Sequence, residues 1–507
     1  MAAATIRADE MGKVLPFPSA RPCARASLLA LRIENLEHIK AAFGECAAAL
    51  ILRTVHERAA AFVGLDGVVD FAGGACIDVL LDGHEAGGGA DAVWHMLDAL
   101  HAPIFPKDAA ECDFTPAAGF CALVNCAAGG LDSPIGQISV IDIERLRDGL
   151  VDALDGKGTL GAPGEGEDWA RRYRADMARA TALHCALVEG DLCLAWQPVA
   201  EAEDAASLLY QEGLLRILAF GADGADNAAV TGLGRLGSET SLSCAPLIVA
   251  AERIGLMRRI DAWVVRQVID QLRDQPGLNL GCNISAQSAV LDGWWSAIVD
   301  DLARSPEIAR RLVIEITETA AFPRIDLAVA FADRMRRLGC TIAIDDFGTG
   351  RAAWRDVVAL DPRIVKIDGA FLRRTATDAA GDAGFEELRH LIALAQCRGR
   401  QVVVEGVETA SLQELAVKAG ARLLQGPWVA NPKLARPYGV TRHHVTEADE
   451  PSGEEAGAAN SPPPIPGFLL TAIEVERRVE SRVRPVMLSS CAALCFSAGL
   501  ALWMHFA

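Results

Sequence analysis

Eight short apolar runs alternate with longer amphipathic stretches between residues 192 and 429, and this alternation limits the folds open to the chain. Two of the amphipathic stretches are Pro246–Leu272 and Glu386–Cys397. Buried strands alternating with helices predict a closed, TIM-like (β/α)8 barrel. A doubly wound open sheet is the rival, although no GxGxxG follows the first strand. The predicted strands are Leu192–Val199, Leu208–Leu214, Leu278–Ile284, Leu312–Thr317, Thr341–Ile344, Ile364–Ile367, Val402–Val404 and Leu423–Val429.

Polar residues stand at or just after the carboxyl ends of these runs. In a barrel those ends meet at one mouth, where catalytic residues are usually found. A single glutamate there is also consistent with a solvated rim, and Asn283 could cap a helix. The occurrence of the whole set in one domain favours a functional site. The set comprises Glu212, Asn283, Glu315, Glu318, Asp345, Asp346, Lys366, Glu405 and Gln425.

The composition of this set indicates a metal site. It holds several carboxylates, an amide and one lysine, but no histidine, which suits Mg²⁺ or Mn²⁺ better than Zn²⁺. Several carboxylates could not stay ionised together in one pocket without cations. Two metal ions a few ångströms apart are a common arrangement for in-line phosphodiester hydrolysis. We therefore expect two ions and phosphodiester chemistry.

The same region resembles the EAL family of cyclic di-GMP phosphodiesterases, and the resemblance covers about half of the chain. Each matching motif is weak alone, but jointly they are specific. The motifs are WQPV (196–199), EGLLR (212–216), PLIVAAERIGL (246–256), NIS (283–285), EITE (315–318), DDFGTG (345–350), KID (366–368), EGVET (405–409) and QG (425–426).

The resemblance implies a role for each matching residue. Glu212, Asn283, Glu315, Asp345 and Glu405 look like metal ligands, with Asp346 at the second metal. Lys366 looks like the residue that holds or deprotonates the attacking water, and Glu318 like the one that orders the loop after Asp346. The dinucleotide contacts would be Gln197, Arg216 and Gln425; a guanidinium suits a phosphate. The implied product is the linear dinucleotide pGpG, and the family barrel has one strand reversed.

Two features depart from the family pattern. Gly213 stands where the signature has alanine, a change that should be tolerated beside a metal ligand but loosens the strand. After DDFGTG, the usual serine-rich continuation is replaced by Arg351, Ala352, Ala353 and Trp354. In the family this loop couples a homodimer of EAL domains to catalysis. The departure therefore concerns regulation through that dimer and leaves the metal ligands intact.

The N-terminal region resembles a degenerate GGDEF diguanylate cyclase domain. LLALRIENLEHIKAAFG (28–44) parallels its first strand and helix, and FAGGACIDVLL (71–81) parallels its signature hairpin. The signature has become GGACI, and Arg32 occupies the metal-binding aspartate position. Without those carboxylates, two-metal phosphoryl transfer cannot run. We expect a regulatory or dimerising module; the alternative is an unrelated α/β sensor domain.

Glycine- and proline-rich stretches divide the chain. Its net charge of −19 argues against a nucleic-acid polymer as partner. Its 14 cysteines include no CxxC pair, which favours reduced thiols in the cytoplasm. The predicted segments are a disordered leader at 1–22, a degenerate GGDEF-like domain at 23–150, a linker at 151–168, the EAL domain at 169–440, a disordered linker at 441–466 and a C-terminal segment at 467–507.

The C-terminal segment contains a nearly uncharged apolar run from Val486 to Met504, preceded by four arginines between residues 477 and 484. Such a run is long enough to span a bilayer, and basic residues before it would stay in the cytoplasm. We expect an inner-membrane anchor. An amphipathic or buried terminal helix is the alternative, because Ser489, Ser490, Ser497 and Gly499 dilute the apolar character.

Three functions are consistent with these features. The first is an active phosphodiesterase, which the undegenerated ligand set favours. The second is a silent cyclic di-GMP receptor, which would need no intact metal ligands. The third is a membrane-tethered scaffold, for which convergent carboxylates have no use.

Overall fold

The computed structural model describes residues 26–64, 67–82, 89–106, 119–131, 138–155, 160–218, 241–317, 322–348, 354–375 and 381–435. Residues 1–436 form one compact unit and residues 437–507 a second, which lies outside the described residues. The predicted leader, most of the C-terminal linker and the predicted anchor at 486–504 therefore lie outside the described part. Within that part, no helix combines the length and apolar character needed to cross a membrane.

The N-terminal part of the chain forms a four-stranded antiparallel sheet with the strand order β2-β3-β1-β4. Its strands are β1 (Ala26–Ile33), β2 (Gly67–Gly73), β3 (Cys76–Asp82) and β4 (Val124–Leu131). The FAGGACIDVLL segment spans the β2–β3 hairpin, whose turn at Gly73 and Gly74 has φ of +98° and +58°, a backbone that favours glycine.

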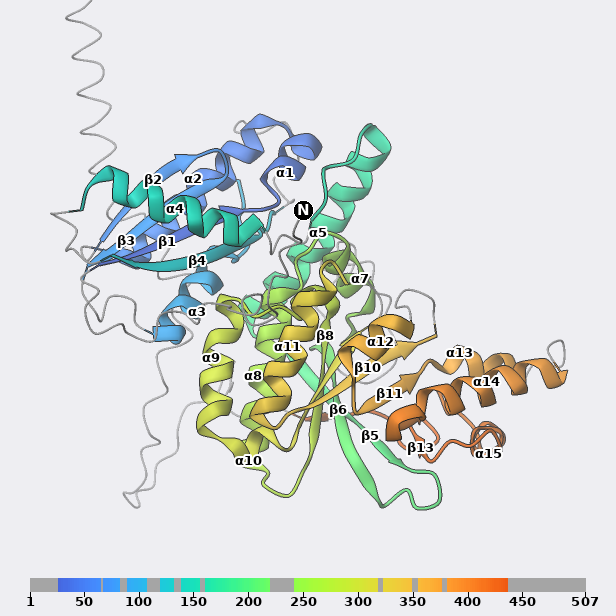
Figure 1. Ribbon diagram of the computed structural model, residues 1–507. Coiled ribbons are helices and arrows are strands. Elements are labelled where there is room, and N and C mark those ends of the chain that lie inside the picture. The colour runs from blue at the N-terminus through green and yellow to red at the C-terminus, as the bar shows by residue number, and fades with distance from the viewer. Residues whose placement is uncertain are drawn as a thin grey trace, which may run out of the picture. The chain divides into compact units, whose positions relative to one another are not determined.

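Helices cover both faces of this sheet, and that explains the almost continuous apolar sequence of β1. Leu29, Leu31 and Ile33 belong to the core that contains residues of α1 (Leu36–Phe43) and α2 (Glu45–Val63). On the other face, Leu28 packs with residues of α4 (Val140–Asp155). α3 (Gly89–Leu100) completes this region (Figure 1).

A closed barrel of eight strands follows, as the sequence predicts. The ring runs β5-β13-β12-β11-β10-β9-β8-β6 and closes where β6 pairs with β5. β5 is antiparallel to both of its neighbours, so the reversed strand implied by the family resemblance is present. The strands are β5 (Leu192–Glu201), β6 (Leu208–Leu218), β8 (Leu280–Ser285), β9 (Leu312–Thr317), β10 (Thr341–Phe347), β11 (Ile364–Ile367), β12 (Gln401–Val404) and β13 (Leu423–Leu424).

Helices surround the strands, with α8, α9 and α11 on the outside of the barrel in Figure 1. Short strands β7 (Ser241–Ser243) and β14 (Lys433–Ala435) pair with β6 and β5. The helices after the first sheet are α5 (Glu167–Glu189), α7 (Ala245–Arg253), α8 (Arg258–Asp274), α9 (Gly293–Arg304), α10 (Pro306–Ala309), α11 (Ile325–Leu338), α12 (Trp354–Leu360), α13 (Gly369–Thr375), α14 (Gly381–Ala395) and α15 (Ala410–Lys418), with 3-10 turns η2 (Ala286–Ser288) and η3 (Cys397–Gly399).

Several boundaries differ from the sequence prediction; among them, β6 runs to Leu218 rather than Leu214 and β10 to Phe347 rather than Ile344. The stretch Pro246–Leu272 is two helices, because the chain turns between them at Gly255, where φ is +79°. β13 ends at Leu424 rather than Val429, since the chain turns at Gly426, where a Cβ would lie 2.4 Å from the Val407 backbone. Residues 151–155 of the predicted linker belong to α4, and residues 167–168 begin α5.

Candidate active site

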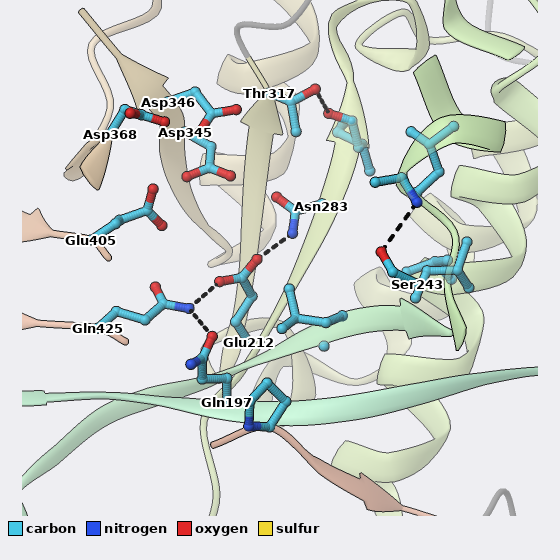
Figure 2. A pocket seen from close by; sticks show the side chains of 18 of the residues that line it. Gln197, Glu212, Ser243, Asn283, Thr317, Asp345, Asp346, Asp368, Glu405 and Gln425 are labelled. Carbon is cyan, nitrogen blue, oxygen red and sulfur yellow. Dashed lines mark hydrogen bonds between the residues drawn. The ribbon is translucent and has the colours of Figure 1, made fainter. Parts of the chain in front are cut away.

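The predicted residues converge at the mouth of the barrel, around a cavity of about 590 Å³. Glu212 comes from β6, Asn283 from β8 and Asp345 from β10, and Glu405 and Gln425 follow β12 and β13. Figure 2 shows these side chains directed toward one another from neighbouring strands. Glu315 of β9 and Lys366 of β11 are fully buried among them. The barrel thus gathers residues that are more than 200 positions apart in sequence.

Lys366 is the centre of this group. Its Nζ lies 2.9 Å from Glu212 Oε2, 2.8 Å from Glu315 Oε2, 3.0 Å from Asp345 Oδ1 and 2.7 Å from Glu405 Oε1. A lysine is almost never fully buried unless it is paired, and here four carboxylates surround it. One ammonium cannot balance four carboxylates, so the cluster keeps an excess of negative charge.

Two amides also orient Glu212. Asn283 donates from Nδ2 to Glu212 Oε1, and Gln425 donates from Nε2 to Glu212 Oε2. Gln425 Nε2 also lies 3.3 Å from Gln197 Oε1, and Gln197 donates to the carbonyl of Ala430 over 3.1 Å. The dashed contacts in Figure 2 trace this chain from Asn283 to Gln197. Glu212 is therefore fixed in one orientation.

The excess negative charge is visible in the pKa values. Burial, followed by the Glu212 carboxylate, raises the pKa of Glu315 to about 8. Burial and the neighbouring Asp345 raise the pKa of Asp346 to about 7, and they raise the pKa of Glu405 well above its usual range. Burial would lower the pKa of Lys366, but the surrounding carboxylates raise it. The lysine is thus charged, and several carboxyls resist ionisation without further positive charge.

Glu212 is the exception among the carboxyls. Burial would raise its pKa, but Lys366 and the hydrogen bonds from Gln425, Lys366 and Asn283 together lower it. It is an anion held in a fixed position, which is what a metal ligand requires.

Several buried oxygens of the site lack the partners that buried polar atoms normally have. Glu315 Oε1 and Asn283 Oδ1 are buried and accept no hydrogen bond. Two groups of carboxylates, whose oxygens lie within 4.8 Å of one another, could each hold a metal ion. The first is Glu212, Glu315 and Asp345; the second is Asp345, Asp346 and Glu405. Asp345 is shared, and all ligands are oxygen, so the residues fit two hard divalent cations.

Backbone geometry brings the two adjacent aspartates into the site. Asp346 has φ of +56°, a conformation uncommon outside glycine, and ladder pairing of β10 with β11 is irregular between Ile344 and Phe347. Neighbouring residues of a regular strand point to opposite faces. The irregularity allows both Asp345 and Asp346 to line the cavity.

The remaining predicted residues fall into two groups. Arg216 lines the cavity, and its Nη1 donates to the carbonyl of Leu215 over 2.8 Å. Glu318 and residues 349–353, the loop that departs from the family pattern, lie outside the described residues.

Sequence reasoning missed three contributors. Asp368 and Arg373 also line the cavity, and Asp368 contributes to the raised pKa of Asp346. The KID motif contained Asp368, but its spacing alone gave it no role. Gly281 lies beneath the site, where a Cβ would come 2.5 Å from Glu315 Oε1. Glycine is required there by the close approach of the carboxylate, and no local pattern signals it.

Gly213, the departure from the family signature, lies directly across the β5–β6 ladder from Trp196. A Cβ at position 213 would lie 3.0 Å from Trp196 Cζ3 and 3.3 Å from the carbonyl oxygen of Gly281. The indole of Trp196 therefore occupies the space that an alanine methyl would need.

A closed (β/α)8 barrel with a lysine-centred carboxylate cluster at its mouth defines the class of protein, a barrel whose mouth is suited to bind divalent cations. Comparison with known families makes the class specific, because residues 180–432 match the family described as EAL domain. Residues 180–432 are therefore an EAL domain.

Two named relatives are similar to part of this chain. Over 190 residues the chain is 30% identical to "Bifunctional diguanylate cyclase/cyclic di-GMP phosphodiesterase MucR" of Pseudomonas aeruginosa, an alignment of 36% of this chain and 27% of that protein. It is 27% identical over 187 residues to "Cyclic di-GMP phosphodiesterase PdeF" of Escherichia coli, covering 36% of this chain and 25% of that protein. The chain thus spans about a quarter of these relatives.

One solved structure is described as the PaMucR phosphodiesterase in its c-di-GMP complex. It aligns with 48% of this chain and 98% of its own length, at 26% identity and a TM-score of 0.39. A score of that size adds nothing to the family match.

Proposed function

We propose that the barrel hydrolyses cyclic di-GMP to linear pGpG with the help of two Mg²⁺ or Mn²⁺ ions. The observation that carries the proposal is the pair of carboxylate groups sharing Asp345 around the buried Lys366. The choice of substrate rests on the relatives, two of which are named as cyclic di-GMP phosphodiesterases. When bound, the two cations supply an activated water and neutralise the charge that develops on the phosphodiester.

The residues of the chain perform the remaining tasks. Glu212, Asn283, Glu315, Asp345, Asp346 and Glu405 would hold the cations. Lys366, whose Nζ lies within 3.0 Å of four of these carboxylates, would hold or deprotonate the attacking water. Gln197, Arg216 and Gln425 border the same cavity and would bind the dinucleotide. Glu318 would order the loop after Asp346.

The proposal is tested by removing one ligand from the full chain. Glu212→Ala should lower the rate of pGpG formation by about 100-fold or more, because even outer partners of metal ligands are worth 10- to 100-fold. Glu386→Ala is the matched control: Glu386 is half-exposed, pairs with Arg389 at 2.6 Å and belongs neither to the carboxylate groups nor to the cavity lining. Full activity of Glu212→Ala would refute the assignment of the site.

For the N-terminal region we propose a domain that synthesises no cyclic di-GMP. Arg32 lies on β1 in place of an acidic ligand, and the hairpin turn carries glycine, alanine and cysteine in place of the acidic signature. We further propose the division of the chain predicted from sequence, with the EAL domain at 169–440, except that residues 151–155 and 167–168 belong to helices rather than to the linker. Pairing of EAL domains into a homodimer, which the family resemblance implies, stays a proposal to be checked by light scattering.

We also propose that the protein acts in the cytoplasm, held at the inner membrane by residues 486–504. The ten cysteines of the described residues are all free, which agrees with a reducing compartment. Support for the anchor comes from the apolar run and the arginines before it.

A further inference from the structure

Helix α8 begins with two consecutive arginines, Arg258 and Arg259, each only 3% exposed. Buried guanidinium groups are costly unless they are paired. Both find partners on the N-terminal sheet domain. Arg259 donates from Nε to Asp98 Oδ1 of α3 over 2.8 Å, and Arg258 donates from Nη1 to Asn125 Oδ1 of β4 over 2.6 Å.

The same arginine also contacts the barrel segment that follows the ligand Asn283. Arg258 Nη1 lies 3.2 Å from Asp292 Oδ2, and Arg258 Nε donates to the carbonyl of Gln287 over 3.4 Å. Arg258 is therefore shared between the N-terminal domain and the chain that leaves β8.

One turn further along α8, Asp261 holds the start of that segment. Its Oδ2 accepts from the backbone N–H of Ser285 over 2.9 Å and from Ser288 Oγ over 2.6 Å. Ser285 is the last residue of β8, two positions after Asn283. Asp261 thus connects the first turns of α8 to the end of the strand that carries Asn283.

Aromatic packing holds the far end of the segment. Trp294, at the start of α9, lies edge-on to Trp94 of α3 with ring centroids 5.7 Å apart, and its ring is 5.1 Å from that of His101. Residues 285–294 are therefore held at one end by Asp261, in the middle by Arg258 and at the other end by the N-terminal domain.

We propose that Asp98 and Asn125 of the N-terminal domain are positioning residues of the phosphodiesterase, which fix Asn283 through the first turns of α8. The proposal rests on the proposed function for its reaction, although its main consequence concerns the affinity for metal. The role of the degenerate N-terminal domain would then be to hold the metal ligand Asn283 in position. This role requires no nucleotide chemistry in the N-terminal domain itself.

The test compares full-length variants by direct Mn²⁺ binding, followed by electron paramagnetic resonance, and by kinetics with cyclic di-GMP. Asp98→Ala combined with Asn125→Ala should weaken Mn²⁺ binding by about tenfold, the lower end of the range for partners of metal ligands. The Mn²⁺ concentration for half-maximal rate should rise by a similar factor, while KM for the dinucleotide changes by less than about threefold.

Asp91→Ala is the matched control. Asp91 is also on α3 and pairs with α8 through Arg266 at 3.3 Å, but it is exposed and Arg266 lies two turns beyond Arg258. This variant should bind Mn²⁺ like the wild type. Asp98→Asn, which keeps an oxygen acceptor for Arg259, should also retain most of the affinity.

Unchanged Mn²⁺ binding in the folded double variant would overturn the proposal. If the double variant does not fold, as judged by its melting curve, Asp98→Ala and Asn125→Ala are measured singly and decide by the same criterion. If the wild type binds Mn²⁺ but hydrolyses no cyclic di-GMP, the proposed function fails. Mn²⁺ binding by the variants would still decide whether Asp98 and Asn125 position the metal site.

Discussion

At the scale of single residues, the site is governed by a surplus of negative charge around one buried lysine. Lys366 contacts four carboxylates, yet burial and mutual repulsion still raise the pKa of Glu315 to about 8 and of Asp346 to about 7. Cations relieve this repulsion, which is why the arrangement suits metal-dependent chemistry.

The pair of Trp196 and Gly213 gives a residue-scale prediction. Gly213→Ala should lower the free energy of unfolding by about 1–3 kcal/mol, because the new methyl meets the indole of Trp196 at 3.0 Å. Adding Trp196→Phe, which shortens the ring, should restore at least about 0.5 kcal/mol relative to the sum of the single changes. Urea unfolding of the four proteins measures the coupling, and strict additivity would contradict it.

Most of the residues that the sequence predicts for the site line one cavity or lie buried beside it, because each stands at a strand end inside a recognisable motif. The sequence could not reveal that Lys366 contacts four carboxylates at once, since those contacts join residues separated by up to 154 positions. Gly281 was missed for the same reason: its need for glycine arises from the approach of Glu315, which belongs to another strand.

At the scale of elements, strands were easier to predict than helix ends. Barrel strands are covered on both faces, so each is a short continuous apolar run bounded by polar residues. The break between α7 and α8 was hidden because residues 254–257 keep the apolar character of their neighbours, and three of these four, all but Gly255, are buried apolar side chains. The turn depends on the left-handed backbone conformation of Gly255, which is set by the packing of the two helices rather than by the local sequence.

His101, directly after α3, gives a prediction about the pH dependence of stability. It is buried and neutral: Nδ1 donates to the Leu97 carbonyl over 2.8 Å, and Nε2 accepts from the Val124 N–H over 3.0 Å. Burial lowers its pKa to about 3. Between pH 6.5 and that value, the unfolded chain binds a proton that the folded chain does not, so the stability from His101 is present above pH 6.5 and lost on acidification.

Between pH 7 and pH 5, this histidine alone should remove about 2 kcal/mol from the free energy of unfolding, at 1.36 kcal/mol per pH unit below 6.5. In His101→Gln that part of the pH dependence disappears, so the variant should lose about 2 kcal/mol less than the wild type over the same interval. Urea unfolding at the two pH values checks this. Equal losses in both proteins would show that His101 is not the proton-binding group.

At the scale of the whole molecule, the alternation of strands and helices was enough to predict a closed barrel, and the reversed strand was implied only by the family resemblance. A pattern of apolar runs carries no strand direction, so the antiparallel pairing of β5 with β6 and β13 is a property of the closed sheet. The contacts of Arg258 and Arg259 with the N-terminal domain were likewise not predictable, since arginine is usually an exposed residue.

The proposed anchor is a whole-molecule prediction that rests on sequence. Deleting residues 485–507 should move the protein from the membrane fraction to the supernatant of lysed cells, because the deletion removes the only long uncharged apolar run in the C-terminal segment. Quantitative blotting of the two fractions measures the shift. A membrane fraction that equals that of the full chain would show that residues 486–504 are not the anchor.

The central claim is that this barrel cleaves cyclic di-GMP by metal-dependent hydrolysis. Incubation of the full chain with cyclic di-GMP and Mg²⁺ or Mn²⁺, followed by chromatography of the nucleotides, tests it most directly. The account predicts that pGpG accumulates and that a chelator abolishes its formation. Cyclic di-GMP that stays intact while the protein binds both Mn²⁺ and the dinucleotide would contradict the account and identify a receptor instead.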